Sequence, residues 1–199
     1  MNEVSFDSLG VDGSKGNGEW IELYLTQAAN LKGYSLRNSK DELLYTFGAL
    51  QMPADGIVLI LLSDVIKYPF DADPNDGRVA VAADLPNADH LGNDFGGVRL
   101  LTRKGKEVDS LSWGIGAAPI GNADRSWFDI SFGTGNPIGE SDSLGRALMP
   151  GRTFTGGAKD WDRHGGRDSI RATPGRRNGI EIYNVPGMLV DTQIGVSDI

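Results

Sequence analysis

Strict alternation of large polar and apolar positions marks residues 19–25 as a β-strand. Successive side chains of an extended chain leave the backbone on opposite faces, so Trp20, Glu22 and Tyr24 share one face. The apolar residues between them share the other face. The pattern predicts a half-buried strand whose core side carries Ile21, Leu23 and Leu25.

Short apolar or alternating runs recur through residue 113, separated by clusters of Gly, Asn, Asp and Pro. This spacing is typical of a β-sandwich, in which short strands follow one another through turns. The Lys-Gly-Lys triplet at 104–106 predicts a tight hairpin turn, and no run in this part demands a helix. The predicted strands are 3–6, 19–25, 34–37, 43–47, 57–62, 78–82, 98–101 and 108–113.

The pattern loosens between residues 114 and 166, where Gly and Pro are frequent and apolar residues stand singly. A connection of this length is uncommon in a compact domain and is usually functional. We therefore expect long loops folded over the sandwich, where a binding surface would lie. Alternation returns at 180–183, so residues 179–199 are expected to form a strand-like extension that packs on the domain or on a neighbouring subunit.

Composition favours one domain and narrows the class of partner. The chain has 199 residues, 39% of them hydrophobic, which suffices for one core, and its 28 glycines favour turns over long helices. A net charge of −8 repels nucleic-acid phosphates and anionic lipid surfaces. Cysteine is absent, which removes disulfides, thiolate zinc sites and cysteine nucleophiles. No apolar run is long enough for a transmembrane helix, and Met1 leads into Asn2 without a signal-peptide pattern.

A series of short motifs follows one order along the chain. Asn-Glu-Val at 2–4, Glu-Trp-Ile-Glu-Leu-Tyr at 19–24 and Leu-Lys-Gly-Tyr-Ser-Leu at 31–36 come first. The later motifs are Leu-Gly-Asn-Asp at 91–94 with Gly-Val-Arg-Leu at 97–100, Val-Asp-Ser-Leu-Ser-Trp-Gly at 108–114, Ser-Leu-Gly-Arg at 143–146, Asp-Trp at 160–161 and Thr-Pro-Gly-Arg-Arg-Asn at 173–178.

In this order the motifs resemble the lamin tail domain family. The resemblance implies an immunoglobulin-like β-sandwich over residues 1–178, with a non-catalytic role in attachment or protein interaction. In bacteria such domains often accompany secreted hydrolases or nucleases. The family supplies no catalytic residues, and this chain departs from it after residue 25, where the usual Asn-Pro turn is replaced by Thr-Gln-Ala-Ala, and in the added segment after Asn178.

Oxygen-bearing side chains gather in one short loop, at Asp71, Asp73, Asn75 and Asp76. Carboxylate and amide oxygens are the ligands that Ca²⁺ prefers, so these four residues are candidate metal ligands. The loop is out of register for an EF-hand, because its glycine stands seventh and no glutamate stands twelfth. An Asx-rich turn accounts for the same residues. Calcium is therefore a hypothesis here, and no cofactor is required.

Arginine is concentrated near the end of the sandwich motifs, in an otherwise acidic chain. One interpretation is a patch for an acidic protein partner or for nucleic acid. The other is that the arginines brace loops through bidentate contacts to neighbouring aspartates, which the net charge favours. The candidate partner-binding residues are Arg163, Arg167, Arg171, Arg176 and Arg177.

Recognised catalytic patterns do not occur in the sequence. His90 and His164 have no Gly-x-Ser-x-Gly nucleophile elbow to work with, and there is no His-Glu-x-x-His, phosphate-loop or dinucleotide motif. Glu19 and Glu22 stand three apart on a strand, so they face opposite sides and do not form an acid–base pair. We therefore expect no enzymatic activity.

The expected function is a structural, adhesion or protein-interaction module of a surface or extracellular assembly. A virion accessory or decoration protein is an alternative within the same fold. A Ca²⁺-dependent accessory module of a secreted hydrolase and a nucleic-acid-binding module are further alternatives. The expected partners are proteins or assembly neighbours, with an oligomer formed through residues 179–199 as one arrangement, and with neither nucleic acid nor membrane insertion favoured.

Overall fold

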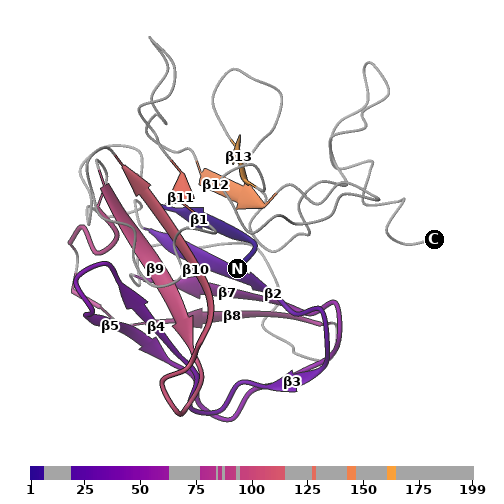
Figure 1. Ribbon diagram of the computed structural model, residues 1–199. Helices are drawn as coiled ribbons and strands as arrows, with labels where there is room; N and C mark the ends of the chain where they lie inside the picture. The colour runs from indigo at the N-terminus through magenta and orange to yellow at the C-terminus, as the bar shows by residue number, and fades with distance from the viewer. Residues whose placement is uncertain are drawn as a thin grey trace, which may run out of the picture.

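The protein is an all-β sandwich, as the sequence predicts. The computed structural model describes residues 1–6, 19–62, 77–83, 85–86, 88–92 and 95–114, together with the backbone of 127–128, 143–146 and 161–164. The elements in these ranges are all strands, arranged in two open sheets and one short pair (Figure 1). The described ranges hold no helix that is long and apolar enough to cross a membrane.

The larger sheet has six strands. Neighbouring strands in it are antiparallel except β7 and β8, which run parallel and so need a crossover rather than a hairpin. In spatial order the strands are β13 (Trp161–His164), β12 (Ser143–Arg146), β1 (Glu3–Ser5), β2 (Trp20–Tyr24), β7 (Ile57–Leu61) and β8 (Arg78–Ala82).

The second sheet has five strands, antiparallel except for the β10–β11 pair. A separate two-stranded pair joins β3 (Ala29–Asn30) to β6 (Gln51–Met52). In spatial order the five strands are β11 (Trp127–Phe128), β10 (Glu107–Gly114), β9 (Phe95–Leu101), β4 (Ser35–Asn38) and β5 (Leu43–Thr46).

One hydrophobic cluster fills the space between the two sheets. Ile21 and Leu23 of β2 belong to it, on the face that the alternation predicts. From the opposite sheet, Trp113 is fully buried and stacks on Phe6 with ring centroids 4.4 Å apart. Each such side chain contributes about 1.5–3 kcal/mol by leaving water. The shared cluster makes the two sheets a single folding unit.

The prediction that the strand at 19–25 is half-buried is wrong, because β2 is buried on both faces. Trp20 and Glu22, on the face away from the core, are as inaccessible as Ile21 and Leu23. β2 lies in the interior of its sheet, between β1 and β7, and the β7 residue opposite Glu22 is the fully buried Leu59. Alternation identifies which residues share a face, but it does not report whether the second face is covered.

Every strand predicted up to residue 113 is present, with shifted ends. The largest shift is in β9, which begins at Phe95 rather than at residue 98. The predicted hairpin turn at 104–106 is confirmed by the bond from the Thr102 amide to the Lys106 carbonyl, 2.8 Å, and by Gly105 at φ 76°. Positive φ is easy for glycine alone, which explains the residue at that place.

The prediction of long loops from 114 to 166 is wrong at three places, where β11, β12 and β13 lie, and most of the other residues in this range lie outside the described part of the chain. β12 pairs with β1, placing Leu144 opposite Val4, and β13 continues the sheet beyond it. These strands are short, and Ser-Leu-Gly-Arg shows no alternation, so pairing with an existing sheet edge rather than local propensity stabilises them. Residues 179–199 lie outside the described ranges, and the boundary at 178 remains a prediction.

Candidate functional site

The residues predicted to bind metal or partners lie largely outside the described part of the chain. Asp71, Asp73, Asn75 and Asp76 fall in one undescribed range, and Arg167, Arg171, Arg176 and Arg177 in another. Arg163 stands in β13, where its backbone lies opposite Leu144 of β12. Within the described ranges, no three His, Asp or Glu side chains come together as a metal-binding group.

Glu19 holds a loop against the start of β2. The residue is only 3% exposed, and its two carboxylate oxygens accept hydrogen bonds from the backbone amides of His90 and Leu91, at 2.8 and 2.9 Å. Burying a carboxylate costs several kcal/mol unless such partners replace water. Glu19 is therefore an anchor for residues 88–92, a segment with no strand of its own.

Asn38, at the end of β4, fastens the same loop from the opposite sheet. Its side-chain nitrogen donates to the backbone oxygen of His90 at 3.0 Å and to the Glu42 carboxylate at 2.7 Å. Its side-chain oxygen accepts from the backbone amides of Lys40 and Glu42. This buried amide thus organises the β4–β5 turn and ties the turn to His90.

Trp113 completes the attachment through its indole nitrogen, which donates to the backbone oxygen of Gly92 at 2.7 Å. Backbone groups at 90–92 are therefore bonded by Glu19, which directly precedes β2, by Asn38 of β4 and by Trp113 of β10. Such bonding satisfies main-chain groups that would otherwise be buried without partners.

Two glycines allow this loop to approach β9 closely. Gly92 has a φ of +83°, and a Cβ on it would lie 2.3 Å from the Phe95 carbonyl oxygen. A Cβ on Gly96 would lie 1.8 Å from the Leu91 carbonyl oxygen. Both distances are far inside van der Waals contact, so only glycine fits. The Leu-Gly motif at 91–92 and Gly96 of β9 are thus explained by packing.

A second buried carboxylate belongs to Glu22, which accepts a hydrogen bond from the side chain of Asn2 at 2.5 Å. Glu3 of β1 lies directly opposite Glu22 in the ladder, and it too is fully buried. Both side chains point to the sheet face away from the core, since their neighbours Val4 and Ile21 point into it. Asn2, which directly precedes β1, thereby links the start of β1 to β2.

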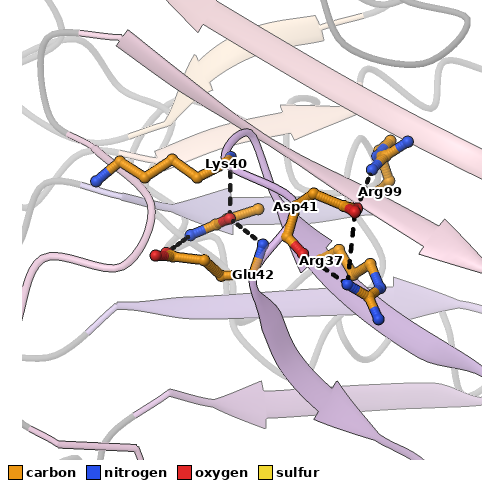
Figure 2. Close-up of polar contacts among 6 residues, drawn as sticks. Arg37, Lys40, Asp41, Glu42 and Arg99 are labelled. Carbon is orange, nitrogen blue, oxygen red and sulfur yellow. Dashed lines mark hydrogen bonds and ion pairs between the residues drawn. The ribbon is translucent and has the colours of Figure 1, made fainter.

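The outer face of the five-stranded sheet carries a pair of arginines that the sequence analysis did not identify. Arg37 of β4 and Arg99 of β9 are Cα partners, and both alternate with core residues, so they point away from the core. Figure 2 shows Asp41, from the β4–β5 turn, between the two guanidinium groups. Each arginine alone looks like an ordinary polar strand position. Their pairing depends on a register between distant segments that no local pattern reveals.

Asp41 contacts both arginines. One carboxylate oxygen accepts a hydrogen bond from the Arg99 guanidinium at 2.5 Å, and the other lies 3.7 Å from that of Arg37. Arg37 also donates to the Asp41 backbone oxygen at 2.6 Å. Asp41 has a φ of 64°, in the left-handed region that Asp and Asn tolerate better than most residues. The arrangement offers guanidinium groups for an anion on an accessible sheet face.

Comparison with known proteins assigns no function to the chain, so the candidate sites rest on the geometry described above. No protein-family model matches the chain, and no curated protein matches it. The described part therefore presents two functional candidates of different kinds: the anchored loop at 88–92 and the arginine pair on the outer sheet face.

Proposed function

We propose that this protein is a non-catalytic structural, adhesion or protein-interaction module, with the immunoglobulin-like sandwich of a lamin tail domain and a place in a surface or extracellular assembly. The observation that supports the proposal most strongly is the burial and hydrogen bonding of Glu19. Its buried carboxylate is bonded on both oxygens to main-chain amides.

A general acid or base must reach its substrate and exchange a proton with it. Glu19 is closed off from solvent and engaged with the loop, and Glu22 is fully buried against Asn2. Both glutamates therefore act in folding. The effect of Glu19 is to hold residues 88–92 in one conformation, which suits a surface presented to another protein.

The proposed likeness to a lamin tail domain is supported by the structural roles of the residues in the shared motifs. Leu91 and Gly92 lie in the anchored loop, and Trp113 both stacks in the core and bonds to that loop. Motifs with these roles specify a fold rather than a reaction. This agrees with the non-catalytic character that the lamin-tail resemblance implies.

The test compares the full chain with a chain that ends at Asn178, using light scattering over a range of concentrations. We expect the mass of the full chain to rise with concentration and that of the shorter chain to stay monomeric, since the last segment has the pattern of an added strand. Phosphodiester and glycoside substrates are offered to the same samples, and no turnover is expected. Turnover by the folded monomer, with no association in either chain, would refute the proposal.

A further inference from the structure

The like charges of Arg37 and Arg99 face each other across the β4–β9 ladder. Like charges directly opposite in a sheet are destabilising, so this pair needs an anion beside it. Asp41 is the one carboxylate bonded to the pair among the described residues. The Asp41 carboxylate lies close to the Arg99 guanidinium and farther from that of Arg37. The positive charge of the arginine pair is therefore only partly neutralised.

The accessible surface of this cluster suits a ligand from outside. The side chain of Asp41 is 66% exposed and that of Arg37 is 34% exposed, whereas that of Arg99 is 23% exposed. The Nε atom of Arg99 is buried and has no hydrogen-bond partner within the described ranges. Arginine can present Nε and Nη together to one carboxylate as a fork. Here Asp41 bonds the Nη side, and the Nε side is unbonded but covered, so a ligand carboxylate reaches Nε only when the groups that cover it move.

An apolar neighbour extends the site toward the sheet edge. Leu43 of β5 is the Cα partner of Arg37, so it lies on the same outer face, and it is 49% exposed. Among the described strands, β5 pairs with β4 alone. Leu43, Arg37 and Arg99 thus form a row across the outer face of the sheet, with an exposed leucine at one end and two guanidinium groups beside it. Figure 2 shows Lys40 extending away from the arginine pair, so it is not part of this row.

We propose that Arg37, Arg99 and Leu43 form a docking site for an acidic segment of a protein partner, in which a carboxylate replaces Asp41 on the arginine fork and an adjacent apolar side chain covers Leu43. The inference rests on the proposed function and names the chemistry of the partner. A peptide is favoured over a nucleic acid because the net charge of −8 repels a phosphate backbone but tolerates one or two carboxylates at a local basic site.

The experiment is an NMR titration of the ¹⁵N-labelled full chain with a capped peptide of alternating Asp and Leu. The peptide with Asn for Asp is the uncharged control, and a single-stranded oligonucleotide is the second arm. We expect the Arg99 Nε–H signal to move with the Asp peptide alone. Arg99→Gln and Arg37→Gln should each weaken binding about tenfold, as expected for the loss of a charge-assisted hydrogen bond.

Lys104→Gln is the matched control, since it removes one charge from the exposed β9–β10 turn and should leave binding unchanged. Arg99→Lys keeps the charge but lacks the fork, and should bind as weakly as Arg99→Gln. Asp41→Asn suits the positive φ and removes the internal competitor, so it should bind the peptide more tightly than the native chain.

Equal losses in Lys104→Gln and Arg99→Gln, or full binding in Arg99→Lys, would reduce the effect to general charge and overturn the site. Preferential binding of the oligonucleotide would overturn the choice of ligand. If Arg99→Gln does not fold, the Arg99 Nε–H signal and Asp41→Asn still decide the matter. No peptide binding, combined with association that depends on residues 179–199, would end this inference and leave the proposed function standing.

Discussion

Gly96 shows at the residue scale how closely the 88–92 loop is fitted to the sandwich. A methyl group there would meet the Leu91 carbonyl oxygen at 1.8 Å and the Trp113 ring at 2.8 Å. Neither can retreat easily, because the Leu91 amide is bonded to Glu19 and the Trp113 ring is stacked on Phe6. The tight approach is a consequence of the same bonds that fix the loop.

We predict that Gly96→Ala lowers the free energy of unfolding by about 1–3 kcal/mol or more, as overpacking does in other proteins. Gly48→Ala is the control, because a Cβ at Gly48 meets nothing within 4 Å. It should change stability by less than about 0.5 kcal/mol. Urea unfolding of the two variants provides the measurement, and equal midpoints would show that the loop does not lie against β9 in this way.

Residue-level features were predictable where they depend on local pattern. The core face of β2 follows from alternation, and glycine at 105 follows from turn geometry. The bonds of Glu19 to His90 and Leu91 were not predictable, because they join segments far apart in the sequence. A glutamate before a strand gives no local sign of which distant amides it will accept.

Individual strands differ in how strongly their surroundings hold them. β2 has partners on both sides and is buried on both faces, whereas β5 pairs with β4 alone among the described strands and exposes Leu43. Local opening of a strand becomes easier as its buried contacts and ladder bonds decrease. The centre of the six-stranded sheet should therefore be the most stable part of the described fold.

Hydrogen exchange measured residue by residue tests this ranking. We predict that amides of β2 and β7 exchange only through global unfolding, and that those of β5 exchange orders of magnitude faster. The amides of β4 serve as the internal comparison, since that strand is paired on both sides. Protection of β5 equal to that of β2 would mean that the β5 edge is covered, and would contradict its accessibility to a partner.

Prediction at this scale succeeded for strands with their own hydrophobic signal and failed for those without it. The apolar run at 57–62 is predicted from its composition, and the structure confirms it as β7, which ends one residue earlier, at Leu61. β12 contains one apolar residue in four and forms because the edge of β1 accepts it. The same holds for β3 and β6, which are two-residue strands. Their existence is a tertiary effect that local propensity does not encode.

At the scale of the whole molecule, one prediction concerns the dependence of folding on metal. The two sheets share one continuous core, and the buried carboxylates Glu19 and Glu22 are bonded to protein groups. We predict that EDTA leaves the melting temperature unchanged, because the core that joins the two sheets is built from hydrophobic side chains. Added Ca²⁺ provides the complementary arm: if Asp71, Asp73, Asn75 and Asp76 form a site, the melting temperature should rise with the logarithm of the Ca²⁺ concentration.

A fall in melting temperature on chelation would show that the fold depends on a metal and would contradict the first prediction. Asp73→Asn with Asp76→Asn identifies the source, because this double substitution should abolish a Ca²⁺-dependent rise in melting temperature if that loop binds the ion.

The fold class was predictable for the molecule as a whole. The position of a functional surface was not, because the arginine pair arises only from the register of β4 on β9.

The buried glutamates of this sandwich hold its structure together, and Glu19 fixes the 88–92 loop. Glu19→Gln tests this role directly in thermal unfolding. A glutamine has one acceptor oxygen, so its NH₂ group would face one of the amides of His90 and Leu91. The expected loss is about 1–3 kcal/mol, or roughly 2–4 °C in melting temperature for each kcal/mol in a domain of this size.

Glu42→Gln is the matched control, because Glu42 is exposed and its side chain still offers Asn38 an acceptor oxygen. We predict a clear fall in melting temperature for Glu19→Gln and almost none for Glu42→Gln. A Glu19→Gln protein as stable as the native chain would contradict it, because the carboxylate would then have no structural role.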